Sequence, residues 1–253
     1  MKDSTIYNVR VIERAMQVLD CFDDDHPEIG ISEIAQRTSL SPATALRLLV
    51  TLQGGGYVER AAGSDKFRLG PRLMEMGMGV VRRLRARREA RPVMVALEER
   101  FQETCDLSVF VQNALLCVDV VQSRRALRIA GGPGYRSPLH CTASGKVFLA
   151  NLPPEDADAM LGAPLERHTA KTITSPERLR EQIAEIRARG YGTDDEEFGQ
   201  GVRAVAAPIR NPDARVIAVL GMVGPVERMD AERQREIGLA LVEAADAISA
   251  RLA

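Results

Sequence analysis

The stretch at residues 32–69 constrains the fold of this chain more than any other part of the sequence. It predicts two short helices joined by a tight turn. The second helix starts at Ser41-Pro42, where a hydroxyl can cap the helix and the proline ring occupies the first helical position. Gly54-Gly55-Gly56 ends that helix, and two alternating segments at 57–60 and 66–69 predict a strand pair. This order is typical of a winged helix-turn-helix, so duplex DNA is the first partner to consider.

The second helix of this stretch has two chemically different faces. One is an apolar stripe formed by Ala45, Leu48, Leu49 and Leu52. The other carries small side chains and a single arginine, a composition that suits the major groove; its members are Ala43, Thr44 and Arg47. Lys66 and Arg68 lie on one face of the second strand, where they could meet phosphate. A helix-turn-helix outline alone occurs in many helical proteins, and the strand pair strengthens the prediction.

The segment before this stretch predicts a helix that completes a three-helix core. Apolar residues recur there at helical spacing, and we expect all of them in the core rather than on DNA: Ile12, Ala15, Met16, Leu19 and Phe22.

Composition indicates two domains with different charge. At 253 residues the chain is long enough for two cores of ordinary size. Residues 1–88 carry 14 Lys and Arg against 11 Asp and Glu, whereas the rest carries 20 against 24. The small basic excess therefore lies at the predicted DNA end, and it favours a few well-placed phosphate contacts over general polycation binding.

Other compositional features indicate which cellular compartment and which kinds of binding partner to expect. The four cysteines lack metal-site spacing and a disulfide framework, so free thiols in a reducing cytoplasm are expected. We find no secretory leader pattern and no run near the roughly 18 apolar residues of a membrane helix, so no membrane partner is expected. Tryptophan is absent and aromatic residues make up 4% of the chain, which disfavours stacking on single-stranded bases.

The remainder predicts a linker and an α+β domain. A helical stretch with a wide apolar face follows Gly70-Pro71, and we expect it to break near Arg91, just before Pro92. Short apolar runs then predict strands at residues 107–111, 115–122, 127–130, 202–209 and 216–223. Helices are expected at about 142–151, 154–161, 176–189 and 230–252. This order indicates one antiparallel sheet whose concave face would hold a ligand.

The motif at residues 137–150 is a loop that runs into a helix. Backbone N–H groups of Ala143 and Ser144 would be exposed at the positive end of the helix dipole, which favours a carboxylate ligand. A catalytic interpretation is available, because His140, Cys141 and Lys146 lie close to Ser144 in sequence. We do not favour it, since the cluster lacks an orienting third group and matches no hydrolase signature. A hydrogen bond that fixes the loop is the simpler role for His140.

Four consecutive carboxylates in the glycine-flanked segment at 190–201 form the second motif. Their spacing fits no calcium loop, so no metal is expected. Asp194, if ionised, would repel a carboxylate; it is better suited to accept a bond from a ligand hydroxyl or amine, or to hold the loop. Tyr191 and Phe198 are expected to pack rather than to contact ligand.

Five segments, in this order, resemble the IclR family of bacterial transcription regulators over nearly the whole chain. They are Ala-Thr-Ala-Leu-Arg-Leu-Leu, Gly-Tyr-Val-Glu-Arg, Arg-Leu-Gly-Pro-Arg-Leu, Pro-Leu-His-x-Thr-Ala-Ser-Gly-Lys and Gly-Tyr-x-x-Asp-Asp-Glu-Glu-Phe-x-x-Gly-Val-Arg-x-Val-Ala-Ala-Pro-Ile. The resemblance implies a winged helix-turn-helix at residues 1–70, a linker helix used in dimerisation at 71–90 and a GAF-like effector-binding domain at 91–253. It also implies a homodimer or a dimer of dimers, with no catalytic residue, metal or cofactor.

The resemblance further implies two sets of site residues. The DNA contacts would be Ser41, Pro42, Ala43, Thr44, Arg47, Lys66 and Arg68. The effector pocket would be lined by Ile129, Ala143, Ser144, Asp194, Val202, Ala204, Gly221 and Val223. Members that bind small polar acids tend to carry small polar side chains where this chain has Ala204, Gly221 and Val223. We therefore expect a carboxylate effector with an aromatic or longer apolar body rather than a very small, oxygen-rich acid.

Together these features predict a ligand-responsive, sequence-specific DNA-binding regulator, either repressor or activator, of a catabolic operon. The alternative is a metabolite-binding protein or enzyme whose helix-turn-helix serves protein interaction.

Overall fold

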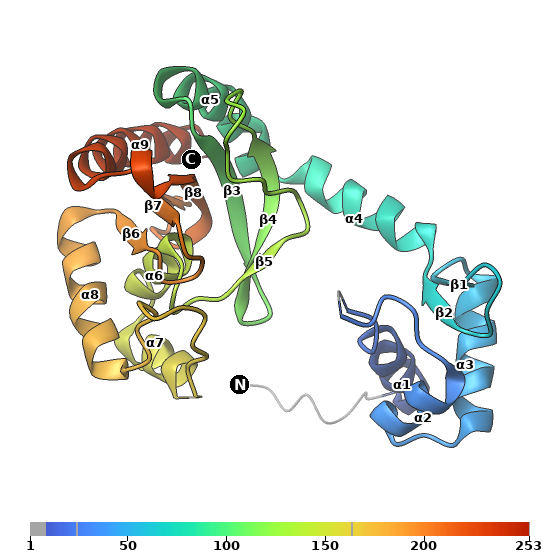
Figure 1. The fold of residues 1–253 in the computed structure, drawn as a ribbon. Helices are drawn as coiled ribbons and strands as arrows, with labels where there is room; N and C mark the ends of the chain where they lie inside the picture. The colour runs from blue at the N-terminus through green and yellow to red at the C-terminus, as the bar shows by residue number, and fades with distance from the viewer. Residues whose placement is uncertain (1–8, 24, 163, 253) are drawn as a thin grey trace. The chain divides into compact units, whose positions relative to one another are not determined.

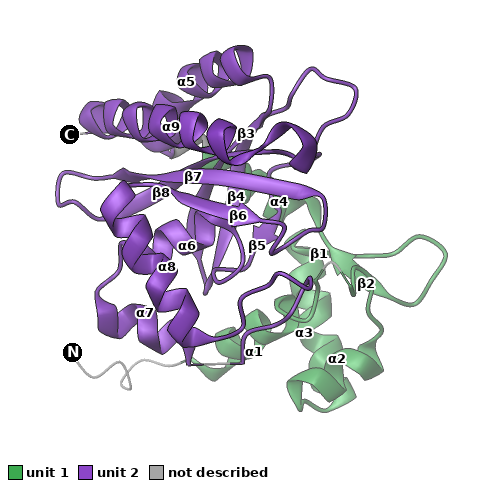
Figure 2. Cartoon of the chain, turned by 60° about the vertical axis from the view of Figure 1, so that its left-hand side comes forward, with its two compact units in different colours: residues 1–83 green, residues 84–253 purple. Residues whose placement is uncertain are grey.

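The computed structural model describes residues 9–23, 25–162 and 164–252 of the chain, apart from the side chains of residues 82 and 83. The chain forms two compact units, residues 1–83 and 84–253 (Figure 2). Each unit is described by itself below. Among the described helices none is long and apolar enough to cross a membrane.

The first unit is a winged helix-turn-helix, as predicted. Its elements are α1 (Arg10–Leu19), α2 (Ile31–Thr38), α3 (Pro42–Gly54), the antiparallel pair β1 (Val58–Arg60) and β2 (Phe67–Leu69), and α4 (Pro71–Arg83). The Oγ of Ser41 accepts a 3.2 Å bond from the N–H of Thr44, and Pro42 takes the first helical position. The helix start that the sequence indicated is therefore confirmed.

The core of the first unit corrects one expectation. It is built by buried residues of all three helices and the wing, among them Val18, Phe22, Ile34, Ala45, Leu49, Val58 and Phe67. Ile12 and Met16 were expected in this core, but their side chains are 52% and 58% exposed. Because α1 packs through Ala15, Val18 and Leu19, the neighbouring apolar stripe is left on the surface.

The wing continues into α4 at Gly70. The N–H of Gly70 donates to the carbonyl of Tyr57 at 2.8 Å, and the N–H of Arg72 donates to that of Gly56. A Cβ at position 70 would lie 2.2 Å from the carbonyl oxygen of Gly56, so only glycine allows this approach. Beyond this junction α4 exposes apolar side chains, namely Met74, Met76, Met78 and Val80.

The helix break lies at Leu84 and not near Arg91. Leu84 has extended backbone angles and caps α5 (Arg85–Phe101), so Pro92 lies inside a continuous helix. Ala86 and Ala90 are buried in the core of the second unit. This packing holds the helix together across the proline, which is why the sequence-based break was placed wrongly.

One six-stranded antiparallel sheet forms the centre of the second unit. Its strands are β3 (Thr104–Val111), β4 (Ala114–Val121), β5 (Arg136–Ser137), β6 (Gly192–Asp195), β7 (Val202–Arg210) and β8 (Val216–Pro225), in the order β5-β4-β3-β8-β7-β6. The strand expected at 127–130 is wrong, because this segment is a loop. The carbonyl of Ile129 is bonded by the hydroxyl of Thr104 at 3.0 Å instead of by a strand.

Helices cover both faces of this sheet (Figures 1 and 2). On one face α5 and α9 (Ala231–Leu252) bury a core; on the other lie α6 (Ala143–Ala150), α7 (Pro154–Leu161) and α8 (Pro176–Arg189). A short 3-10 turn, η2 (Val226–Arg228), precedes α9. Side chains of β8 point alternately to the two faces of the sheet. Leu220 and Met222 enter the α5–α9 core, whereas Val219 packs on the α6 side.

Candidate ligand pocket and nucleic-acid interface

The predicted DNA-facing residues lie at the start of α3 and on the wing. Ser41, Pro42, Ala43 and Arg47 are exposed, and Thr44 is half-buried because its hydroxyl meets that of Ser41 at 2.9 Å. These side chains therefore form one accessible surface at the helix start.

The three cations predicted to contact DNA, one on α3 and two at the wing, differ in whether their side chains have partners. The side chains of Arg47 and Lys66 are exposed, and neither has an ion-pair or hydrogen-bond partner among the described residues. Arg68 instead pairs across the wing with Glu59, its Nε lying 2.7 Å from Oε1. Arg47 and Lys66 are thus available to a nucleic acid, whereas Arg68 would first have to leave Glu59.

A cavity of about 540 Å³ lies on the α6 side of the sheet. Its volume is in the range typical of small-molecule sites. It gathers seven of the residues predicted for the effector pocket: Ile129, Ala143, Ser144, Asp194, Val202, Ala204 and Val223. The eighth, Gly221, borders it, since a Cβ there would lie 3.3 Å from the Oγ of Ser144.

The start of α6 supplies polar backbone to this cavity. The Oγ1 of Thr142 caps the helix by accepting a 3.0 Å bond from the N–H of Gly145, and its own proton goes to the carbonyl of Pro138. The preceding N–H groups of Ala143 and Ser144 belong to the first helical turn, which has no partner within the helix. The arrangement can therefore hold an anionic oxygen.

Asp194 both lines the cavity and holds the adjacent loop. It is the third residue of β6, and its Oδ1 accepts a 2.7 Å bond from the N–H of Glu197. Burial raises the pKa of Asp194 to about 7, although the hydrogen bond from the N–H of Glu197 favours the ionised form and acts in the opposite direction. At neutral pH this carboxyl is thus shared between its protonated and ionised forms.

Sequence reasoning missed the polar row on β3. Thr104, Asp106 and Ser108 all line the cavity, and the Oγ of Ser108 donates to Oδ2 of Asp106 at 3.0 Å. Burial raises the pKa of Asp106. The signal was present as alternation: Cys105 and Leu107, between these polar residues, enter the opposite core. The strand was predicted only from residue 107 to 111, so Thr104 and Asp106 lay outside it and the row was not recognised.

Two aromatic residues of the acidic segment have different surroundings. Tyr191 is buried in the α5–α9 core, as expected. Phe198, which was expected only to pack, lines the cavity and meets the ring of His168 edge-on at 5.0 Å between centroids.

The side chains of the catalytic alternative are not arranged as a nucleophile and base. Lys146 is buried and paired with Glu197, and it donates to Gln182 at 2.9 Å. The Nε2 of His140 lies 2.8 Å from the carbonyl of Glu166, which is the loop-fixing bond that we expected. Burial raises the pKa of Cys141 to about 12, so its thiol stays protonated.

One group of side chains has the composition of a metal site. His140, Cys141 and His168 offer ligand atoms within 4.8 Å of one another. The two histidines also have contacts within the protein, since Nε2 of His140 lies 2.8 Å from the carbonyl of Glu166 and the ring of His168 packs edge-on against Phe198.

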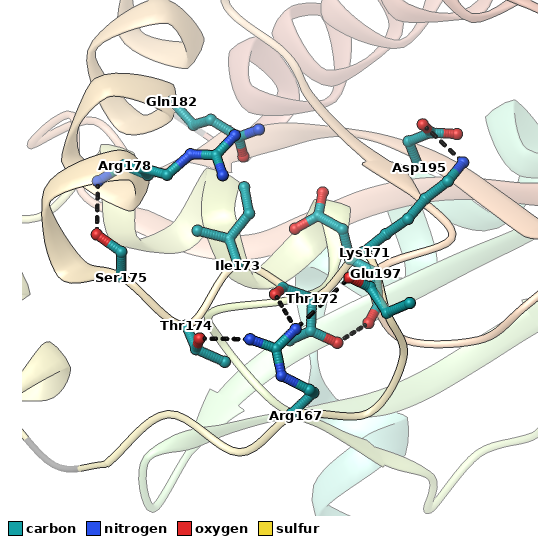
Figure 3. Close-up of a pocket in the computed structure, with 11 residues that line it drawn as sticks. Arg167, Lys171, Thr172, Ile173, Thr174, Ser175, Arg178, Gln182, Asp195 and Glu197 are labelled. Carbon is teal, nitrogen blue, oxygen red and sulfur yellow. Dashed lines mark hydrogen bonds and ion pairs between the residues drawn. The ribbon is translucent and has the colours of Figure 1, made fainter.

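A second cavity, of about 440 Å³, lies near the start of α8 (Figure 3). Arg167 donates to Thr174 Oγ1 at 3.0 Å and to the carbonyl of Thr172, and Lys171 pairs with Asp195. These cations are already satisfied by the loop that they support. None of the predicted effector residues lines this cavity.

The family models of known proteins match both units. The IclR helix-turn-helix domain matches residues 11–62, and the model described as bacterial transcriptional regulator IclR C-terminal matches residues 78–250. The chain belongs to the IclR family. It is therefore a transcriptional regulator with a DNA-binding domain and an effector-binding domain, not an enzyme.

Individual members of the IclR family resemble the chain over most of its length. BhcR of Paracoccus denitrificans is 35% identical over 95% of this chain and 86% of its own. XynR of Escherichia coli is 34% identical over 93% of this chain and 97% of its own. The crystal structure of an IclR homolog from Microbacterium hydrocarbonoxydans, complexed with 4-hydroxybenzoate, is 30% identical, covers 96% of this chain and 98% of that one, and has a TM-score of 0.80.

Proposed function

We propose that this IclR-family regulator controls a catabolic operon by binding operator DNA as a homodimer or dimer of dimers, in response to a carboxylate with an apolar body. The observation that carries the proposal is the cavity on the sheet, where aliphatic walls lie beside the open helix start of α6. Ile129, Val202, Ala204 and Val223 supply the walls.

The walls favour a larger effector over a glyoxylate-sized acid. Each Å² of apolar surface removed from water contributes about 25 cal/mol, so an aromatic or branched body gains from them. A small, oxygen-rich acid would find no hydroxyl or thiol at Ala204 and Val223, and each missing hydrogen bond is worth about 1 kcal/mol. That a relative was crystallised with 4-hydroxybenzoate, an aromatic carboxylate, supports the same class.

The effector must act through a difference between two arrangements of the dimer. A ligand changes DNA affinity only if it binds the DNA-competent and the incompetent arrangement unequally. The distance between paired recognition helices must match the spacing of the operator half-sites. The effector-binding domain would thus control DNA binding by setting that distance.

A gel-shift titration against the DNA upstream of the protein's own gene tests the regulator function. We expect a specific complex at physiological salt, whose stability changes when the effector is added. If no specific complex forms with or without candidate acids, the proposal fails.

The effector class has a separate test. Thermal-shift measurements should show larger stabilisation by benzoate-sized or branched acids than by glyoxylate. The variant A204S/V223S restores hydroxyl groups and should improve glyoxylate binding by roughly fivefold per hydrogen bond formed. A clear preference of the unmodified protein for glyoxylate would contradict the predicted class.

A further inference from the structure

Asp106 and Gly221 face each other across two neighbouring strands of the cavity. They are paired residues in the register of β3 and β8. A Cβ at position 221 would lie 2.6 Å from Oδ1 of Asp106 and 3.3 Å from the Oγ of Ser144. The carboxyl of Asp106 therefore occupies the space that a side chain on β8 would need. Because β8 carries Gly221 at this position, the polar group beside Ser144 is the carboxyl of Asp106 on β3.

The carboxyl of Asp106 has donors from its own strand but no cation beside it. The hydroxyl of Ser108 donates to Oδ2, and the backbone N–H of Asp106 itself also bonds to the carboxyl. No lysine or arginine is among the residues that line the cavity, all of which belong to the described part of the chain. Burial, the main cause of its raised pKa, is thus not offset by a cation. An acceptor in this state binds best to a ligand group that brings a proton.

The position of Asp106 also limits what an acid bound at α6 can look like. The Oγ of Ser144, on the first turn of α6, and Oδ1 of Asp106 both border the point where a Cβ of Gly221 would lie. A ligand carboxylate held by the N–H groups of this turn would therefore approach the carboxyl of Asp106. Two carboxylates at short range repel each other, unless a hydrogen-bond donor lies between them.

We propose that Asp106 selects the effector by accepting a hydrogen bond from a hydroxyl or amino group on the carbon next to the ligand's carboxylate. This inference rests on the proposed role of the cavity as the effector pocket. It narrows the ligand class from apolar acids to 2-hydroxy or 2-amino acids with an apolar body, and it adds Asp106 and Gly221 to the specificity-determining residues.

Matched acids test this selection. The probes are mandelate, phenylglycine and phenylacetate; 3-phenyllactate, phenylalanine and 3-phenylpropionate; and 2-hydroxyisocaproate, leucine and 4-methylvalerate. Calorimetry with the full-length protein at pH 7.5 should show that in at least one set the hydroxy or amino member binds about tenfold or more tightly than its unsubstituted relative. Equal affinity within each set, or no binding by any of the nine acids at 10 mM, would overturn the proposal.

Three variants separate selection from a merely structural role. D106A should abolish the difference within a set while the unsubstituted acid still binds. D106N keeps an acceptor oxygen without the negative charge, so it should retain a hydroxyl preference and lose an amine preference. G221A displaces the carboxyl without altering Asp106 itself, so it should reduce the difference as well. If D106A weakens all members of a set equally, Asp106 does not select.

The outcome is independent of the DNA-binding test. Acids that bind with the expected preference but leave the DNA complex unchanged would support the role of Asp106 and contradict the proposed effector response. A specific DNA complex that responds to these acids, but without tighter binding of the hydroxy or amino acids, would support the effector response and contradict the role of Asp106.

Discussion

At the scale of single residues, the cations predicted to contact DNA differ in whether a neighbouring carboxylate already pairs with them. Arg47 is exposed and unpaired within the described structure, so it can read a base or grip a phosphate. Replacing it with alanine should cost about 1–3 kcal/mol of specific binding if it reads a base.

K66A should instead weaken binding to all DNA sequences alike, and it should lower the slope of log binding constant against log salt concentration by about 1. R68A should have the smallest effect, because Glu59 already holds that guanidinium.

Gel shifts over a salt series, with the specific site and a scrambled one, measure these effects. An R47A protein with unchanged affinity for the specific site would remove Arg47 from the interface.

The carboxyl of Asp194 should make stability depend on pH in an unusual direction. Its pKa rises from 3.8 to about 7 on folding, so between these values the folded chain binds more protons than the unfolded one. The contribution of this group is therefore present below about pH 4 and is lost as the pH rises to about 7. The loss is on the order of 2–4 kcal/mol.

Urea unfolding of the D194N variant from pH 4 to 8 tests this dependence. Asparagine keeps the oxygen that accepts the N–H of Glu197 but does not titrate. The difference in unfolding free energy between D194N and the parent should grow in favour of D194N as the pH rises through this window. A difference that stays constant with pH would contradict the raised pKa.

At the scale of elements, a buried ion pair holds α6 to the loop after β6. Lys146 of α6 is 1% exposed, and its partner Glu197 has one carboxylate oxygen with no hydrogen-bond partner in the described structure. K146M leaves the carboxylate of Glu197 buried without its cation, which should lower the unfolding free energy by about 3–5 kcal/mol. The double variant K146M/E197L should recover part of that loss, because it removes both charges.

The exposed pair of Lys171 with Asp195 and Glu196 provides the matched control for this experiment. K171M should cost no more than about 1 kcal/mol, since exposed pairs are weak. Urea titration of the three variants measures the losses. A K146M effect as small as that of K171M would show that the buried pair does not stabilise the effector domain.

The sequence predicted those elements whose ends carry strong local signals. The bounds of α8 were predicted correctly because Ser175-Pro176 starts it and Gly190, at a φ of 84°, ends it. The break between α4 and α5 was predicted near Arg91 instead of at Leu84, since Leu84 has no such signal and the burial of Ala90 overrides the proline at 92. Local signals cannot report packing that forms only in the folded domain.

The same contrast holds for the cavity. Residues on the α6 start, β7 and β8 were anticipated through the family resemblance, and the structure gathers them. Alternation within β3 could have placed Asp106 on the cavity face, but not opposite Gly221, because that pairing depends on β8 lying beside β3. Strand order is a property of the tertiary fold, and no periodicity within a single segment encodes it.

At the scale of the whole molecule, the exposed apolar stripes on α1 and α4 predict self-association. Ile12 and Met16 on α1, and Met74 and Met78 on α4, are each at least half exposed. We expect these stripes to be covered in a homodimer, because burying them removes apolar surface from water. Exchanging Met74 and Met78 for glutamate should shift the protein toward monomer and weaken binding to a two-half-site operator more than to a single half-site.

Light scattering coupled to size exclusion measures the oligomeric state of this variant. The control is E75Q, which changes a polar side chain on the same helix and should leave the state unaltered. A double glutamate variant that keeps the mass of the parent assembly would show that α4 is not the contact.

The junction at Gly70 has a mechanical consequence for such an assembly. Between the last residue of the wing and the first turn of α4 there is a single glycine, and backbone bonds tie this turn to Gly56 and Tyr57. Gly56 and Tyr57 in turn donate to the carbonyls of Gln53 and Leu52 in α3, so the same two residues are bonded both to the recognition helix and to the start of α4. A displacement of α4 would therefore reach the recognition helix and the hairpin together.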